Sequence, residues 1–404
     1  MLSSKIKKDT LVNLISFAFF GLSGLLINFI IAHYYSAETL GLFNIYYAIF
    51  IFISQFAGAG IHLSVLKNTS HDKNEEHYIL INGIFAVSFN AFFYLTTAFF
   101  LRNYFNIFFT NQSYVDLIII ILPAIFFYVI NKVFLAYINA KKQMVHYAIF
   151  YSLRFFLMIV ALFVLISLKV EPKYCISIFL VAEFLLFIFL VLYTRKSFKK
   201  GKLSKSWIIV HFQHGYKSAI GSVLIDVNTR VDVLMLGFFT NEKMVGIYSF
   251  ASMLIDGFNQ LPIVFRTIVN PYITEKYFSH DTVGLRKQIC WGRNLTYKLL
   301  LPLGVLAIIL YPVTLKVLGF YVDYSSSILP FTILMVGALI SIGYAPFLMI
   351  FNQTGFPGTQ SVLYFLIFIT NVIFNAILIP FFGINGAAIA TAISFALSMY
   401  FIKY

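Results

Sequence analysis

Residues 213–239 read QHGYKSAIGSVLIDVNTRVDVLMLGFF. The stretch is apolar enough, and long enough, to cross a bilayer as one helix, which takes about 20 residues. It nevertheless carries Asp226 and Arg230 near its centre. Ionisable groups at membrane depth are costly unless they pair or face water, so by default they mark a functional site. The stretch therefore predicts a membrane-spanning helix that borders a polar cavity.

The composition of the whole chain places this helix in a polytopic membrane protein. The 404 residues are 60% hydrophobic and only 11% charged, whereas soluble globular proteins carry about 25% charged residues. Backbone groups within lipid must be satisfied inside their own segment, which favours helices over open sheets. The sequence therefore predicts an all-α fold.

Apolar runs of the length that spans a bilayer occur twelve times. They cover residues 11–34, 41–65, 78–101, 115–138, 147–168, 175–194, 213–239, 244–270, 292–318, 326–350, 360–381 and 384–402. The first run follows Lys5, Lys7 and Lys8 in the manner of a signal peptide. Because this run is too long for a signal peptide and no cleavage site follows it, we expect a retained first helix.

The charges of the loops set the orientation of these spans. One side of the predicted topology carries 17 Lys and Arg residues and the other carries five. The richer side includes the N-terminus, the basic segment 195–212 and the C-terminus. Because Lys and Arg accumulate in cytoplasmic loops, both termini of this multi-pass protein are predicted to be cytoplasmic. The short loops leave no room for a soluble active site, and the chain has no P-loop, so we expect no enzyme and no ATPase.

The basic segment divides the spans into two equal sets. The sequence predicts an N-terminal six-helix bundle over 1–194, a basic cytoplasmic linker over 195–212 and a C-terminal six-helix bundle over 213–404. Contact with anionic lipids and control of topology account for the charge of the linker better than a specific ligand does.

A short repeat supports this division. LGLF at 40–43 and VGIY at 245–248 lie 205 residues apart, and the same offset aligns Gln55 with Gln260. Because each half has an even number of spans, both halves share one orientation. The repeat therefore predicts a pseudo-two-fold axis along the membrane normal, with a substrate site between the halves near the midplane.

Five segments carry a resemblance to a known family. They are VDVLMLGFF at 231–239, VGIY at 245–248, NAKK at 139–142, NQTG at 352–355 and GINGAA at 383–388. In their order and spacing the chain resembles the Wzx-type polysaccharide flippases, which export O-antigen and capsule repeat units. These belong to the multidrug/oligosaccharidyl-lipid/polysaccharide exporter superfamily. The resemblance implies two six-helix bundles around a V-shaped central cavity that opens alternately to each side of the bacterial inner membrane.

The resemblance also implies the partners of the chain. Its substrate would be an oligosaccharide linked to undecaprenyl diphosphate, and its neighbours would be membrane lipids, a polysaccharide polymerase and a chain-length regulator. The net charge of +14 is the positive-inside signature and does not indicate nucleic acid. The chain has no Cys/His ligand cluster, so we expect neither a metal nor a cofactor. No motif names a sugar.

Cations within the apolar segments are the candidate substrate-binding residues. They are Lys132, Arg154, Arg230, Arg266 and Lys298, and all but Arg230 fall in the cytoplasmic half of their spans. A diphosphate needs positive donors, and the guanidinium fork of Arg matches phosphate oxygens. The alternative for Lys132 and Lys298 is snorkelling, in which a long side chain near a helix end reaches the interface and does nothing else.

Acidic and amide residues complete the predicted site. Asp226, Asp256 and Glu183 are charge partners of the cations or coupling residues. In one helix, Asp226 and Arg230 would lie on one face and pair, either at the cavity wall or as a structural lock. Asp232 lies toward the outer end of its span and is expected to be solvated. Intramembrane amides are the candidate sugar contacts: Asn28, Gln55, Asn228 and Gln260.

A flippase is the leading hypothesis. A multidrug cation antiporter of the same superfamily would need an acidic site, whereas the cytoplasmic half of this chain is cationic. A membrane polysaccharide polymerase would need a large outer loop with catalytic Arg or His, and the outer loops here are short. Transport of a peptidoglycan precursor or a teichoic-type unit stays an alternative substrate for the same mechanism.

Overall fold

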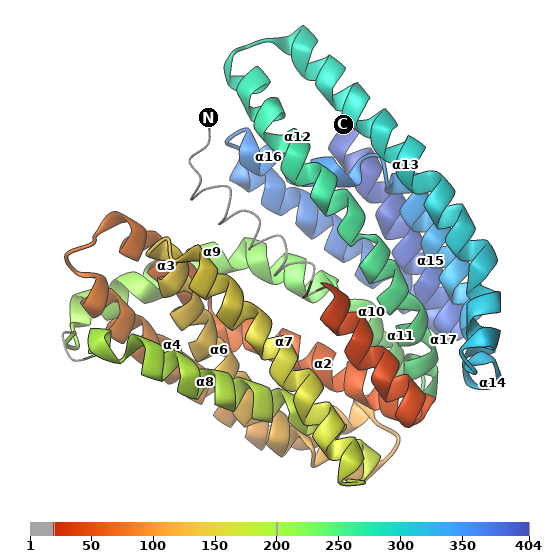
Figure 1. Cartoon of the computed structure of the whole chain (residues 1–404), viewed down its shortest axis with the longest axis horizontal. Helices are drawn as coiled ribbons and strands as arrows, with labels where there is room; N and C mark the ends of the chain where they lie inside the picture. Colours follow the sequence, from red (N-terminus) through yellow and green to blue (C-terminus); the bar gives the residue numbers. More distant parts are fainter. Residues whose placement is uncertain (1–18, 20, 199–200, 404) are drawn as a thin grey trace. The chain divides into compact units, whose positions relative to one another are not determined.

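The computed structural model describes residues 19, 21–198 and 201–403. All regular secondary structure in these residues is helical (Figure 1). Eight of the described helices are long and apolar enough to cross a membrane, and a shorter apolar helix runs from Gly21 to Tyr34. The chain is thus an all-α membrane protein, as expected. The twelve expected spans do not appear as twelve continuous helices, because several of them are broken.

The contacts within the chain divide it into two compact units. Among the described residues, unit 1 comprises those through Ile30 together with Ile45–Asp226, and unit 2 comprises Ile31–Asn44 and those from Val227 onward. One unit boundary falls inside the continuous helix α2, Ala37–Gly58. The expected bundles over 1–194 and 213–404 stay a prediction.

The helices of unit 1 follow one another with short connections. After α2 they are α3 Ile61–His71, α4 Glu76–Phe100, η1 Arg102–Phe108, α5 Gln112–Val115, α6 Ile118–Ala140, α7 Met144–Ser167, η2 Pro172–Ile176, α8 Ser177–Phe198 and α9 Lys205–Asn228. Helix α6 packs against α3, α4 and α8, and α7 packs against α8. An apolar sequence that is buried on most sides, as α6 is, marks the centre of a bundle. In the core beside it, the rings of Phe50 and Phe179 stack 5.2 Å apart.

Unit 2 is built around two long helices. Its elements are α10 Val231–Phe239, α11 Glu242–Phe258, α12 Gln260–Phe278, α13 Thr282–Val317, α14 Tyr321–Tyr324, η3 Ser325–Ser327, α15 Ile328–Ser341, η4 Ala345–Phe347, α16 Ile350–Gln353 and α17 Pro357–Lys403. Helix α17 packs against α15 and α10, and α13 packs against α12 and α15. The rings of Tyr311 and Phe331 stack 4.0 Å apart between α13 and α15.

Helix α17 covers both of the last two expected spans. Its 47 residues contain one non-helical residue, Gly383, with φ 55° and ψ −129°. Residues with a side chain avoid this conformation, whereas glycine adopts it readily. Gly383 therefore marks the corner between the expected spans 360–381 and 384–402.

The segment between α8 and α9 is anchored to unit 1. The side chain of Asn82, on α4, donates to the backbone oxygen of Lys202 at 3.0 Å and accepts from the backbone nitrogen of Ser204 at 2.7 Å. His211, which is fully buried, lies 3.0 Å from Ser64 Oγ and 3.1 Å from the backbone oxygen of Ile79. Helix α9 thus begins within the segment 195–212 that the sequence marks as a linker.

Candidate functional site

A buried ion pair joins α7 and α8 in unit 1. Nε of Arg154 lies 2.6 Å from Oε1 of Glu183, and their side chains are 7% and 0% exposed. Asn131, on α6, donates Nδ2 to Oε2 of Glu183 at 2.8 Å and to the Glu183 backbone oxygen at 2.9 Å. A buried charge needs a partner of opposite sign and hydrogen bonds, and Glu183 has both. The carboxylate of Glu183 therefore compensates most of the positive charge of Arg154.

The ring of Tyr128 connects this pair to Lys132. The Cζ atom of Arg154 lies 4.7 Å from the ring centroid of Tyr128, and Nζ of Lys132 lies 5.4 Å from it. At such distances a cation is attracted to the face of an aromatic ring. Tyr128 and Lys132 are four residues apart on α6, so they share one side of the helix. Lys132 is half-buried and Arg154 is buried, which makes Lys132 the more accessible cation.

A carboxylate and an amide lie next to this cluster. Nε2 of Gln55, on α2, donates to Oδ2 of Asp226, on α9, at 2.9 Å. Gln55 is buried and Asp226 is half-buried. The negative charge of Asp226 attracts Lys132, while Arg154 repels it. We call these residues the unit 1 charge cluster: Gln55, Tyr128, Lys132, Arg154, Glu183 and Asp226.

The expected seventh span is not one helix. Helix α9 ends at Asn228 and α10 begins at Val231, and Arg230 between them has φ −133° and ψ 2°. The expectation that Asp226 and Arg230 share one helical face is therefore wrong, because the helix on which it depends is interrupted between them. Broken helices at membrane depth expose backbone groups and are a recurrent feature of substrate sites in transporters.

Arg230 belongs to unit 2, where it meets a carboxylate of α11. Its NH2 atom lies 3.5 Å from Oδ2 of Asp256, and the two side chains are 22% and 52% exposed. A pair this exposed is held less firmly than the pair of Arg154 and Glu183, because solvent weakens the attraction between its charges. Arg230 can therefore exchange Asp256 for an incoming anion at a modest cost.

Asp232 is buried, so the expectation of a solvated carboxylate is wrong. Its Oδ2 accepts a hydrogen bond of 2.5 Å from the hydroxyl of Tyr248, on α11, and its Oδ1 accepts from the backbone nitrogen of Val233. Asp232 is 8% exposed and Tyr248 is fully buried. The carboxylate lies in the first turn of α10, where the helix dipole stabilises a negative charge. Asp232 thus fastens α10 to α11.

A chain of amides crosses unit 2 at the helix break. Asn371, on α17, donates Nδ2 to Oδ1 of Asn228 at 3.3 Å. Asn375, one turn later, donates to Oδ1 of Asn371 at 2.8 Å. Both α17 residues are buried. Sequence reasoning selected Asn228 but missed Asn371 and Asn375, although two Asn residues four apart in an apolar run are a signal of a buried polar face.

The other predicted residues lie apart from these pairs. Arg266, on α12, is half-buried and interacts with Tyr364 of α17. Lys298 is exposed on α13 and Gln260 is exposed at the start of α12. Asn28 donates its side-chain amide to the backbone oxygen of Gly24, one turn earlier in its own helix.

One cation of unit 2 was missed because it stands at the start of a predicted span. NH1 of Arg293, on α13, donates to the hydroxyl of Tyr344 at 3.3 Å. Tyr344 lies in the irregular segment after α15, where the expected span 326–350 is interrupted. In the sequence, a cation close to the end of a predicted span cannot be distinguished from a solvated residue at a helix terminus. The partner of Arg293 is therefore visible only in the structure.

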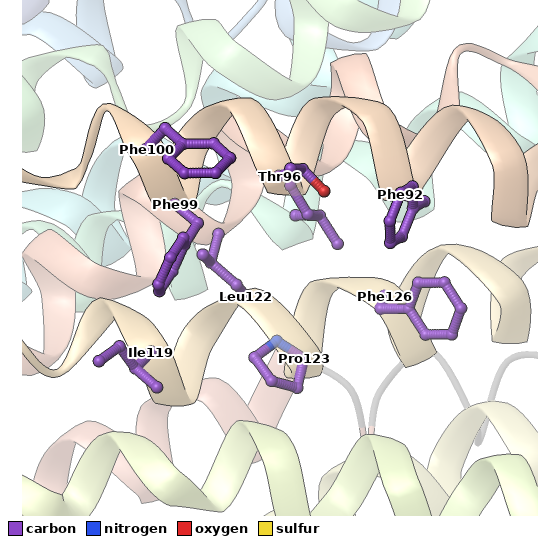
Figure 2. A pocket seen from close by; sticks show the side chains of 9 residues that line it. Phe92, Thr96, Phe99, Phe100, Ile119, Leu122, Pro123 and Phe126 are labelled. Carbon is purple, nitrogen blue, oxygen red and sulfur yellow. The ribbon is translucent and has the colours of Figure 1, made fainter.

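An apolar groove lies between α4 and α6 of unit 1 (Figure 2). It has a volume of about 390 Å³ and is lined by Phe92, Leu95, Thr96, Phe99, Phe100, Ile119, Leu122, Pro123 and Phe126. No charged side chain lines it, so the groove suits hydrocarbon rather than phosphate or sugar. Among the residues with described positions, no group of three or more His, Cys, Asp or Glu could hold a metal ion.

Comparison with known families decides what kind of protein has this arrangement. Residues 6–276 match the model of a family described as polysaccharide biosynthesis protein. The chain belongs to this polysaccharide biosynthesis family. The match confirms the resemblance found in the sequence at the level of this family. No curated protein matches the chain in sequence.

Solved structures show that the family member has a known transporter fold. The lipid II flippase MurJ, in an inward closed conformation, has a TM-score of 0.80 at 16% identity, over 97% of this chain and 86% of that one. An inward-facing multidrug resistance MATE transporter of the MOP superfamily has a TM-score of 0.73 at 14% identity, over 96% and 95%. A MOP superfamily transporter from Pyrococcus furiosus has a TM-score of 0.64 at 13% identity, over 96% and 92%. The chain therefore has the fold of the multidrug/oligosaccharidyl-lipid/polysaccharide exporter (MOP) superfamily.

Proposed function

We propose that this chain is a flippase for an oligosaccharide repeat unit linked to undecaprenyl diphosphate. It would move the unit from the cytoplasmic to the outer leaflet of the bacterial inner membrane, for O-antigen or another surface polysaccharide. Two six-helix bundles would alternate the access of a central cavity, and both termini would be cytoplasmic. The polysaccharide polymerase and the chain-length regulator would act on the exported unit.

One observation carries the proposal: a member of the polysaccharide biosynthesis family has the same fold as the lipid II flippase MurJ. Membership alone allows any step of polysaccharide synthesis, and the fold alone allows any cargo of the superfamily. Together they favour a lipid-linked saccharide as cargo. Lys132 in unit 1 and Arg230 in unit 2 are half-buried cations, and such cations would supply the positive donors that a diphosphate requires.

The exposure and the partners of the candidate anion-binding residues support an order among them. Lys132 and Arg230 are the best placed, because each is partly accessible and each faces a carboxylate that an incoming phosphate can replace. Arg266 and Lys298 would contribute to loading from the cytoplasmic half. Arg154 acts indirectly: it compensates Glu183 and lies against the ring of Tyr128, which also borders Lys132.

Neutral groups would hold the sugar. Gln55 donates to Asp226, the carboxylate that attracts Lys132. Asn228, two residues before Arg230, accepts from Asn371. Asn28 and Gln260 are the remaining candidates. Amides both donate and accept, so they match hydroxyl groups without a charge.

The proposal is tested in a strain that lacks this gene and is complemented by variants. The deletion should remove the surface polysaccharide and accumulate its lipid-linked unit on the cytoplasmic side. Lys132→Ala or Arg230→Ala should weaken headgroup binding by about 1.5–3 kcal/mol, the worth of a hydrogen bond to a charged group, which is roughly 10- to 100-fold in affinity. Lys316→Ala, which removes an exposed cation in the last turn of α13, is the matched control. Normal export in both variants would exclude these residues as the phosphate site.

A multidrug cation antiporter is the second candidate, favoured by the likeness to the MATE transporters. The carboxylate of Asp256, whose side chain is 52% exposed, could face an organic cation. The same strains separate the two functions. An antiporter would change resistance to cationic drugs and leave the lipid-linked saccharide unchanged.

A further inference from the structure

A cation stands at one end of the apolar groove between α4 and α6. Helix α4 ends at Phe100, and Arg102 is the first residue of η1. The Cζ atom of Arg102 lies 4.7 Å from the ring centroid of Phe99, and its NH1 atom donates to the backbone oxygen of Phe99 at 3.3 Å. The ring of Phe99 lines the groove near Ile119 (Figure 2). The guanidinium of Arg102 therefore lies against a ring that forms the wall of the groove.

The charge of Arg102 is not compensated by the part of the chain that the structure describes. Within that part, its guanidinium makes one hydrogen bond, to the oxygen of Phe99, and no ion pair with a carboxylate. A guanidinium presents several N–H donors in a fixed fork. The donors that remain match the geometry of a phosphate group, which they can bind in pairs. Arg102 is thus equipped to bind an anion beside the groove.

The groove itself has the chemistry and the length of a hydrocarbon chain. Leu95 and Leu122 lie buried in it, while Phe92 and Phe100 are exposed at its two ends along α4. At 1.5 Å per residue, the distance from Phe92 to Phe100 along the helix is about 12 Å. One leaflet contributes roughly 15 Å, half of the hydrocarbon core of a bilayer. The groove therefore extends over most of the depth of one leaflet.

The short helix η1 fits the level of the lipid headgroups. None of its seven residues is buried, and Tyr104 and Ile107 are exposed. Tyr side chains gather at the boundary between membrane and water, and a long cationic side chain reaches that boundary with its charge. Arg102 would then lie at headgroup level with the groove running from it into the hydrocarbon. A phospholipid has the same arrangement, with a phosphate at the boundary and acyl chains below it.

We infer that Arg102 and the groove between α4 and α6 bind one anionic phospholipid, with its phosphate on the guanidinium and an acyl chain in the groove. An anionic headgroup is favoured over a zwitterionic one, because an ammonium group would compete with Arg102 for the phosphate. An undecaprenyl chain is several times longer than an acyl chain, so the length of the groove favours the phospholipid. The inference does not depend on the cargo of the transporter.

Native mass spectrometry of the purified full chain measures the affinity of the site. In a titration with phosphatidylglycerol, the first bound lipid should be held more tightly than the later ones, and more tightly than phosphatidylethanolamine. Arg102→Ala should weaken this first binding by about tenfold or more, as the loss of a hydrogen bond between charged groups implies. Lys316→Ala is the matched control, because Nζ of Lys316 also lies over an aromatic ring, 4.9 Å from the centroid of Tyr321. It should leave the first binding unchanged.

A photoreactive lipid locates the acyl chain. Phosphatidylglycerol with a diazirine on one acyl chain should cross-link to residues 92–100 and 119–126, the two sides of the groove. Thr96 lines the groove, so the indole of Thr96→Trp would fill it and should abolish these cross-links and weaken the first binding as Arg102→Ala does. Thr97→Trp is the matched control, because Thr97 is exposed on the same helix and does not line the groove.

Two results would overturn the lipid site. Equal affinity for both phospholipids, unchanged in Arg102→Ala, would mean that ordinary bilayer lipid covers the groove. Displacement of phosphatidylglycerol by a lower concentration of undecaprenyl phosphate would instead assign the groove to the tail of the cargo. Arg102→Lys keeps the charge and loses the fork, so it should lose part of the affinity and serves if Arg102→Ala does not fold. Neither measurement uses export, so failure of the lipid site would leave the proposed flippase intact.

Discussion

At the scale of single residues, the buried charges of this chain have two different environments. Arg154 and Glu183 are both buried and fully engaged with each other. Arg230 and Asp256 are farther apart and partly exposed. Removing two charges from water is costly, and only close contact with further hydrogen bonds offsets that cost. Loss of one member of the first pair should therefore destabilise the fold, while the second pair is exposed enough for a ligand to rearrange it.

Arg154→Ala should destabilise the protein more than it impairs recognition. The variant leaves Glu183 buried without its partner, which costs about 3–5 kcal/mol. We expect a clearly lower Tm for the purified protein in detergent. The double variant Arg154→Met with Glu183→Leu removes both charges and should recover most of the lost stability. A stable Arg154→Ala protein that fails to export would instead place Arg154 in contact with the substrate.

The sequence indicates which residues are charged within the membrane, but not how they pair. Lys132, Glu183 and Asp256 were found because each interrupts an apolar run. The pairing of Glu183 with Arg154 depends on the packing of α7 against α8, for which no periodicity in the sequence provides information. Tyr128 was missed for a related reason: in a chain with 26 Tyr residues, only its position between two cations distinguishes it.

At the scale of elements, the length of the apolar runs predicts the continuous helices, but it does not predict where the other helices are broken. Helices α4, α6, α7 and α8 lie close to the expected spans 78–101, 115–138, 147–168 and 175–194. The breaks in the second, seventh and tenth expected spans fall within apolar runs. There the break is set by local backbone geometry, as at Ala59 and Gly60, which both have positive φ. A hydropathy average over a whole apolar run does not detect a break of one or two residues, so the run is predicted as one continuous span.

Asn82 should control how firmly the chain between α8 and α9 is held. Its side chain binds the backbone at Lys202 and Ser204, and Asn82→Ala would leave both groups without this partner. Loss of such a hydrogen bond destabilises the folded state by about 1–3 kcal/mol when the groups stay buried. We therefore expect faster cleavage by trypsin after Lys202 and Lys205. Asn68→Ala, which removes an amide bonded within α3, is the control and should leave the cleavage rate unchanged.

The turn between α12 and α13 should respond to acid. Hydrogen bonds from Lys276 and then from the backbone nitrogen of Gly284 lower the pKa of Asp281. A carboxylate with a lowered pKa in the folded state stabilises that state above its unfolded pKa, and the stabilisation is lost as pH falls through the folded value. The protection of the amides in the first turn of α13, which compares their exchange rate with that of an unstructured chain at the same pH, should thus be constant near neutral pH and fall only below about pH 4, the usual range of Asp.

Asp281→Asn is the matched variant for that measurement. Asn retains an oxygen that caps the helix, but it cannot titrate. The protection of the amides in the first turn of α13 should therefore no longer depend on acid in the variant. If the variant and the parent chain respond alike, another group is responsible for the response.

At the scale of the whole molecule, orientation is predicted by the asymmetry of 17 against five Lys and Arg residues. In a chain whose two cysteines are replaced, Lys243→Cys should react with an impermeant maleimide in intact cells. Lys202→Cys should react only after the cells are opened. Reaction of Lys202→Cys from outside would invert the topology, and with it the side on which the cations load the substrate.

The net charge of the cargo determines how the membrane potential should act on the cycle. On the proposed function a diphosphate headgroup would move outward as an anion, and an inside-negative potential would favour this movement by about 2.3 kcal/mol per charge per 100 mV. If Lys132 and Arg230 stay with the protein while the headgroup leaves, the moving charge is that of the substrate. In proteoliposomes with a potassium diffusion potential, transport should therefore accelerate when the substrate-loading side is negative and slow when the sign is reversed. A transport rate that does not change with the potential but follows a proton or sodium gradient would instead show that a coupled ion compensates the charge of the cargo. Asp226 and Asp256 would then be the first carboxylates to replace.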